Sequence, residues 1–183
     1  MKSYYIQLFL LLTISTVFGQ DKYLTKTGIT SFEASVPSFE EVKAKNESTT
    51  VILNSQNGDI AALILVKGFR FKNALMEEHF NENYAESDQF PKATFKGTIT
   101  NFKVQSLTDV KTPFTFNGSL NFHGITKEIT NEKIDISSSN DALHLSGNFY
   151  VDVSDFDIEI PKIVSNKLSK KVKVSFNYTL KKK

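Results

Sequence analysis

The sequence contains no cysteine among its 183 residues. This absence excludes disulfide bonds, a thiol nucleophile and a lipid-modified cysteine at a cleavage site. A domain without disulfides depends on its hydrophobic core, and a chain of this length is long enough to form one. Sixteen phenylalanines make the expected core rich in aromatic side chains.

The sequence has a single long hydrophobic run, and this run lies at its start. Lys2 precedes the segment YYIQLFLLLTISTVFG, which has the charged-then-apolar order of a secretory signal peptide and is too short to span a membrane. Val17 and Gly19 are small enough for a signal-peptidase site. We therefore predict a signal peptide at residues 1–19, cleavage before Gln20, and a water-soluble mature domain at residues 20–183 that is periplasmic or secreted.

The sequence also lacks a large excess of charge of one sign. Removal of Lys2 with the signal peptide leaves 21 of the 22 basic residues against 20 acidic ones, which gives no bulk attraction to nucleic acid. Residues 161–183 hold eight lysines and no acidic residue, whereas residues 73–90 hold five acidic residues and no Lys or Arg. Two solvated faces explain this distribution. The functional alternative is a basic end that contacts an anionic head group or, transiently, a membrane surface.

Apolar and polar residues alternate with a period of two through most of the chain, which predicts strands with one buried and one solvated face. The segments PFTFNGSLNFHG, ALHLSGNFYVDV and KVKVSFNYTL are typical examples. Strands are expected near residues 22–35, 40–46, 49–56, 59–67, 92–104, 113–123, 126–138, 141–153 and 171–181. Residues 60–66, IAALILV, are apolar on both faces, which predicts a helix packed on their outer side. Eight or nine such strands indicate a single all-β domain, either a closed antiparallel barrel or a sandwich.

One segment among the strands has helical periodicity. The apolar half of its helical wheel holds Leu75, Met76, Phe80 and Tyr84. The opposite half is acidic and polar, and Pro91 turns the chain into the next strand. A single amphipathic helix in a barrel is expected to cover one end as a lid. Two polar residues, His79 and Asn83, lie in the middle of the apolar half, where they pair with the backbone or meet the polar end of a ligand.

The inward row of phenylalanines has two interpretations. It fills the barrel as a closed core, or it lines a lumen that accepts a lipid tail. Gly97, Gly118 and Gly147 lie in the inward rows, where a missing side chain leaves room or lets a strand bend. The expected wall of the lumen is Phe95, Phe114, Phe116, Leu120, Phe122, Leu145, Phe149 and Phe176. The expected mouth or lid residues are Leu75, Met76, His79, Phe80, Asn83 and Tyr84.

No local group of residues indicates catalysis. The sequence has no Gly-x-Ser-x-Gly nucleophile motif and no His-Glu-x-x-His metal motif. His79, His123 and His144 are isolated from one another in the sequence, and isolated histidines are more often structural than metal ligands. We predict no enzymatic activity, no metal and no cofactor.

Four segments, in this order, resemble the YceI-like family of exported lipid-binding proteins. They are GITSFEAS (28–35), FRFKNALMEEHFNENYAESDQFPKATFKG (69–97), GSLNFHGITKEI (118–129) and FDIEIPKIVSNKLSKKVKVSFNYTL (156–180). The second segment resembles a version of the family associated with Bacteroidetes-type bacteria. The resemblance implies an extended, lipocalin-like antiparallel β-barrel of about eight strands, with one amphipathic helix covering an end. It also implies a hydrophobic lumen that holds a polyisoprenoid or another long amphiphile. The absence of tryptophan separates the chain from true lipocalins, whose first strand carries a Gly-x-Trp signature.

We therefore predict an exported, non-catalytic binding protein for an amphipathic lipid such as a polyisoprenoid or a fatty acyl compound, with no nucleic acid partner. The alternative is an interaction or adhesion domain with a self-filled core and no small-molecule ligand, and a homodimer is compatible with either. Polar residues such as Asn148, Asp152 and Lys173 in the middle of outward strand faces argue against an outer-membrane barrel.

Overall fold

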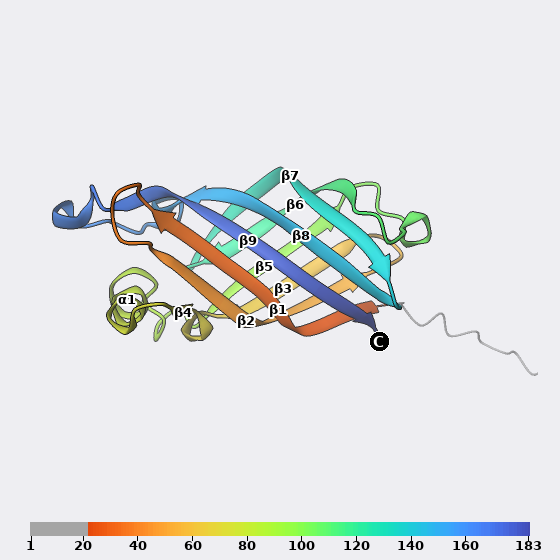
Figure 1. The fold of residues 1–183 in the computed structure, drawn as a ribbon, viewed down its shortest axis with the longest axis horizontal. Coiled ribbons are helices and arrows are strands. Elements are labelled where there is room, and N and C mark those ends of the chain that lie inside the picture. Colours follow the sequence, from red (N-terminus) through yellow and green to blue (C-terminus); the bar gives the residue numbers. More distant parts are fainter. Residues whose placement is uncertain (1–21) are drawn as a thin grey trace, which may run out of the picture.

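The computed structural model describes residues 22–183, which form a closed antiparallel β-barrel (Figure 1). The strand order is β1-β9-β8-β7-β6-β5-β3-β2, and pairing of β2 with β1 closes the sheet. A ninth strand, β4, is only two residues long and pairs with the start of β2. The predicted signal peptide and its cleavage site lie outside the described residues.

The elements follow one another mostly as hairpins. The strands are β1 (Lys22–Ser35), β2 (Lys43–Asn54), β3 (Asp59–Leu65), β4 (Arg70–Phe71), β5 (Lys92–Ile99), β6 (Thr112–Phe122), β7 (Ile125–Ser139), β8 (Ala142–Asp152) and β9 (Leu168–Lys182). The helical segments are η1 (Val66–Gly68), α1 (Ala74–His79), η2 (Phe80–Tyr84), η3 (Val104–Ser106), η4 (Val153–Phe156) and η5 (Lys162–Val164).

The alternating pattern sets which side chains enter the barrel. Along β8, Leu143, Leu145, Phe149 and Val151 are buried, and the residues between them are more exposed. The inward side chains form one long hydrophobic cluster through the barrel and a second, smaller cluster near α1. The prediction of an all-β antiparallel barrel of about eight strands with one helix is confirmed.

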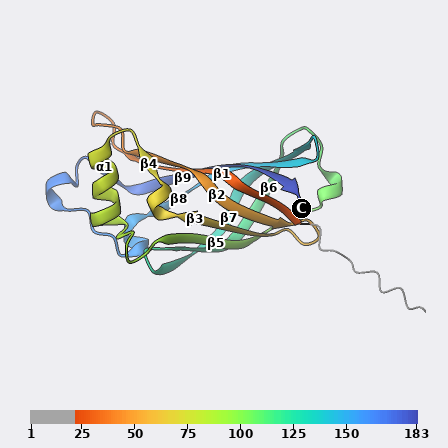
Figure 2. The ribbon, with the colours of Figure 1, turned by 90° about the horizontal axis from the view of Figure 1, so that it is seen from below.

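The helix is shorter than its periodicity predicts. Asn73 caps α1, and its side-chain oxygen accepts a hydrogen bond of 2.9 Å from the amide of Leu75, a contact of a kind that stabilises a helix by about 1 kcal/mol. After His79 the chain widens into the π-helical turn η2, so the regular 3.6-residue period ends there. Glu77 ties α1 to β4, because its carboxylate accepts hydrogen bonds from Arg70 Nη1 (2.9 Å) and from the amide of Phe71 (3.1 Å). Figure 2 shows α1 lying across the end of the barrel opposite to the C-terminus.

Two strand predictions were wrong in detail. Residues 40–46 and 49–56 were expected as separate strands, but β2 runs through the polar stretch between them. This is feasible because buried Asn46 satisfies its own amide group, donating to Leu65 O (3.0 Å) and accepting from the amide of Ser48 (2.8 Å). The strand expected at 92–104 ends at Ile99, and residues 104–106 form the 3₁₀ turn η3.

The helix predicted over the outer face of residues 60–66 is absent from the described part of the chain. The outward residues Leu63 and Leu65 of β3 are exposed, Leu65 by 52%. The helix instead lies at the barrel end, where it follows β4. Apolar residues on both faces of β3 therefore did not indicate that a helix covers its outer face.

Candidate functional site

The end of the barrel beside α1 contains a partly open apolar cavity of about 600 Å³. This volume is within the range of small-molecule binding sites, about 300–1,000 Å³. Side chains from the helical segment, the barrel strands and the connection between β8 and β9 form its wall. From the barrel strands and their loops, the wall includes Phe32, Ala34, Phe39, Ile64, Phe69, Ala93, Leu120, Phe122, Val151, Val172 and Val174. The β8–β9 connection adds Val153, Phe156, Ile158, Ile160 and Val164.

A layer of aromatic rings closes the inner side of this cavity. Phe116 contacts Phe95, Phe149 and Phe176 edge-on, with ring centroids 5.6 to 6.1 Å apart. A second cavity of only about 60 Å³ lies among these rings. The two cavities share four wall residues, Thr30, Ile64, Leu120 and Val174. The barrel is therefore open to a ligand in the half beside α1 and filled by its own side chains further in.

The inward glycines serve this layer of rings. A Cβ atom on Gly118 would lie 2.6 Å from Cζ of Phe95, and one on Gly147 would lie 2.6 Å from Cζ of Phe176. The missing side chains thus make room, as predicted for these positions, but phenylalanine rings of the same barrel occupy that room. The phenylalanine row therefore fills the inner half of the barrel, and the half beside α1 contains a cavity.

The predicted wall residues divide between the two cavities. Leu120 and Phe122 line the large cavity. The small cavity is lined by Phe95, Phe116, Leu120, Phe149 and Phe176. Phe114 and Leu145 border neither cavity: Phe114 packs against Phe102, with ring centroids 6.1 Å apart, and Leu145 is fully buried in the core. Contact of these side chains with a ligand stays a prediction.

Four of the six predicted lid residues line the large cavity, namely Met76, His79, Phe80 and Tyr84. Phe80 is the central one, with its ring centroid 5.1 Å from that of Phe32 and 5.3 Å from that of Phe71. Leu75 and Asn83 point elsewhere and are exposed, Leu75 by 56%. The wheel that placed all six on one face assumed ten α-helical residues, whereas α1 ends after six.

Sequence reasoning missed the part of the wall formed by residues 153–168. No strand, helix or site was predicted for residues 154–170. However, Phe156, Ile158 and Ile160 alternate with polar residues, and all three line the cavity. This period-two pattern was the available signal. Phe32 and Phe69, which form a T-shaped pair with centroids 5.1 Å apart, were also missed as wall residues.

Polar groups are sparse on the cavity wall. Buried Thr30 is not free to bind a ligand, because its hydroxyl hydrogen-bonds to the hydroxyls of Tyr178 and Thr49, each at 2.9 Å. Burial raises the pKa of Tyr178 to about 12, an effect that the hydrogen bond with Thr30 partly offsets. Burial also raises the pKa of Tyr84. The charged and basic wall residues are Glu40, His79 and Lys167. All three side chains belong to residues exposed to solvent, so the polar part of the site is its mouth.

His123, in the β6–β7 turn, contacts two segments beside the cavity, the helix η4 and the residues after η2. Its Nδ1 lies 2.9 Å from the carbonyl oxygen of Phe156, and its Nε2 lies 2.8 Å from Oε2 of Glu86, just after η2. Both partners are acceptors, so both bonds form together when each ring nitrogen carries a proton. The ring also contacts Phe90 edge-on, with centroids 4.7 Å apart. His123 is therefore a structural residue of the site.

A second side-chain contact joins β7 to η4. Lys127 donates a hydrogen bond of 2.7 Å to Asp155, and mainly because of this bond the pKa of Asp155 lies below its usual range.

No three His, Asp or Glu side chains within residues 22–183 form a group that could hold a metal ion. None of the helices in the same range is both long and apolar enough to cross a membrane.

The fold and the cavity define the class of the protein as a cavity-enclosing antiparallel β-barrel. The chain belongs to the YceI-like domain family, whose sequence profile matches residues 15–180. The resemblance of residues 69–97 to Bacteroidetes-type members stays a prediction.

Solved structures show the same fold at low sequence identity. A polyisoprenoid binding domain from Saccharophagus degradans superposes with a TM-score of 0.78 at 14% identity, covering 90% of this chain and 100% of that chain. BcnA from Burkholderia cenocepacia gives a TM-score of 0.67 at 12% identity, covering 83% and 95%. The YceI protein of Campylobacter jejuni gives 0.52 at 13% identity, covering 100% and 99%. No curated protein sequence matches the chain significantly.

Proposed function

We propose that this protein is a non-catalytic binding protein that holds the tail of a long amphipathic lipid, isoprenoid or fatty acyl, in the large cavity. The single observation that carries the proposal is a cavity of about 600 Å³ with an apolar wall and charged groups only at its mouth. Each buried methylene of a tail gains about 0.8 kcal/mol, so tight binding requires few hydrogen bonds.

Two further points support a lipid ligand. A barrel with a self-filled core has no need of such a cavity, because interiors normally pack without large voids. The Saccharophagus degradans relative with the same fold is described as a polyisoprenoid binding domain. Because the sequence predicts a signal peptide, we propose that the protein is located in the periplasm or outside the cell.

The proposal is tested by purifying the mature protein from an exporting host under mild conditions and recording native mass spectra. We expect a discrete adduct that extracts as an isoprenoid or acyl amphiphile, on a chain that starts at Gln20. Delipidated protein is then titrated with oleate and with farnesol. A bare mass together with no binding of either compound would support the interaction-domain alternative.

A matched pair of variants locates the site. Val172 lines the cavity, whereas Lys173, the next residue of β9, points outward in the alternating pattern. We expect Val172→Trp to take up part of the cavity and reduce amphiphile affinity at least about tenfold, since several methylenes lose their place. Lys173→Trp should bind like wild type. Equal affinities of the three proteins would place the ligand outside the cavity.

A further inference from the structure

The connection between β8 and β9 projects beyond the barrel at the end that holds the cavity (Figure 1). Its tip is the short helix η5, which carries Ile163. This side chain is 84% exposed, the largest exposure of any large hydrophobic residue in the described part of the chain. A single exposed apolar residue is common on protein surfaces, so its surroundings decide its meaning.

Apolar surface continues from this tip into the cavity. Val164, directly after Ile163, lines the large cavity, and so does Leu168 at the start of β9. Phe39 of the β1–β2 loop also lines the cavity and is 44% exposed. The exposed hydrophobic residues at this end are thus part of the rim of the mouth.

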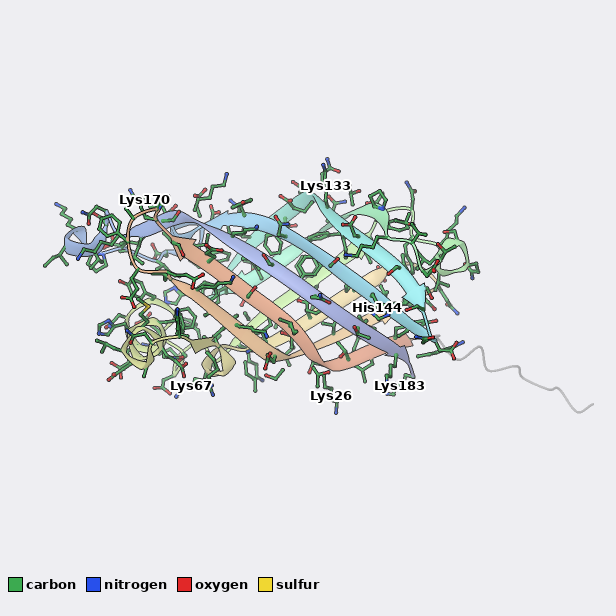
Figure 3. All side chains as sticks on the ribbon, viewed as in Figure 1. Lys26, Lys67, Lys133, His144, Lys170 and Lys183 are labelled. Carbon is green, nitrogen blue, oxygen red and sulfur yellow. The ribbon has the colours of Figure 1, made fainter. Side chains whose placement is uncertain are left out.

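Lysines surround the tip. They are Lys162, Lys167, Lys170 and Lys171, and no acidic residue lies between residues 161 and 183. Figure 3 shows Lys170 at the same end of the barrel as α1, far from Lys183. Lys162, Lys167 and Lys170 form no ion pair with any described residue. The acidic residues nearest in sequence, Asp157 and Glu159, leave the segment 157–171 with an excess of two positive charges.

We infer that the segment 157–171 is a docking surface for an anionic lipid bilayer. Ile163 enters the boundary between head groups and acyl chains, and the lysines lie at the level of the anionic head groups. Each lysine near such a surface contributes about 1 kcal/mol. This inference rests on the proposed function for its purpose, since the docked mouth would face the membrane from which an amphiphile enters or leaves.

The opposite end of the barrel provides the control. Val110, in the loop after η3, is 68% exposed and is followed by Lys111. Unlike Ile163, it is preceded by an acidic residue, Asp109, and neither cavity reaches this loop. Both loops therefore present an exposed apolar side chain, but they differ in charge and in position relative to the cavity.

The test is sedimentation of delipidated mature protein with vesicles of phosphatidylcholine containing about 30% phosphatidylglycerol, compared with phosphatidylcholine alone. We expect binding to the anionic vesicles that weakens as salt is raised, because salt screens surface charge. Ile163→Ser combined with Lys162→Glu and Lys170→Glu should reduce binding at least about tenfold. Val110→Ser with Lys111→Glu should bind like wild type. No binding by wild type, or an equal loss in the control, would overturn the inference.

A second measurement uses the absence of tryptophan from the sequence. Ile163→Trp introduces a single tryptophan at the tip, and Val110→Trp introduces one at the opposite end. We expect a blue shift on anionic vesicles for the first variant only. If the protein retains an amphiphile but shows neither the fluorescence shift nor sedimentation with vesicles, only the docking inference is contradicted. If it binds vesicles but retains no amphiphile, only the proposed function is contradicted.

Discussion

At the scale of single residues, Leu120 is one of the four residues that line both the large cavity and the small cavity behind it. We predict that Leu120→Ala joins the two and shifts the preferred tail of a bound amphiphile toward longer chains. Each additional methylene that is accommodated adds about 0.8 kcal/mol, about fourfold in affinity. A titration with a homologous series of fatty acids measures this, with Ser119→Ala, the preceding residue of β6, as the control. An unchanged optimum would mean that the aromatic layer does not set the depth of the site.

Tyr178 gives a residue-scale prediction in alkaline solution. Its folded-state pKa of about 12 is above its ordinary value of 10.0, mainly because burial disfavours the charged tyrosinate. A raised pKa means that the stabilisation is complete below pH 10 and is lost as the pH rises toward about 12. We expect the free energy of unfolding to fall by about 2 to 3 kcal/mol over this range. Tyr178→Phe should lack this part of the loss in urea titrations. Parallel curves for the two proteins would contradict the assignment.

At the scale of elements, two segments beside the cavity, the end of η2 and the helix η4, are attached to the barrel by side-chain hydrogen bonds rather than by strand pairing. His123, in the β6–β7 turn, bonds both to Glu86 after η2 and to Phe156 in η4. Phe156 is buried, and leaving a buried acceptor without its hydrogen bond costs about 1–3 kcal/mol. We predict that His123→Phe leaves the barrel folded but accelerates amide exchange in residues 80–90 and 153–157 and speeds release of a bound amphiphile.

His144 provides the matched control for His123. It lies near the other end of the barrel and hydrogen-bonds to Ser139 and Thr179 on the sheet (Figure 3). His144→Phe should leave exchange in residues 80–90 unchanged. If both variants accelerate exchange there equally, the effect reflects general destabilisation rather than loss of the link.

The elements also show what sequence patterns can and cannot predict. Strands such as β8 and β9 were predictable because their alternation is set by the barrel itself, with one face always inside. The lid residue Asn83 lies away from the cavity because it is in the π-helical turn, which changes the period. Leu75 lies in the regular helix α1, about 100° round its axis from Met76, which lines the cavity. The aromatic layer could not be predicted, because ring packing against Gly118 and Gly147 depends on register between strands that are distant in sequence.

At the scale of the whole molecule, an occupant of the cavity would contact β1, α1, β6, β9 and the β8–β9 connection together. These segments span nearly the whole described chain, so we expect the bound ligand to stabilise the barrel as one cooperative unit. At a hundredfold excess over the dissociation constant, a ligand that binds only the folded state adds about 2.7 kcal/mol. Thermal unfolding of delipidated protein should therefore show a single transition that moves upward with added oleate.

The Val172→Trp variant separates this linkage from general effects of a fatty acid. Because its affinity is lowered, its transition should move upward less than that of wild type as oleate is added, whereas Lys173→Trp should respond like wild type. A shift of equal size in all three proteins would mean that oleate stabilises the barrel from outside. A smaller shift in Val172→Trp than in wild type and Lys173→Trp would tie the stability of the whole barrel to the occupancy of one end, because the filled inner half offers the ligand no second place to bind.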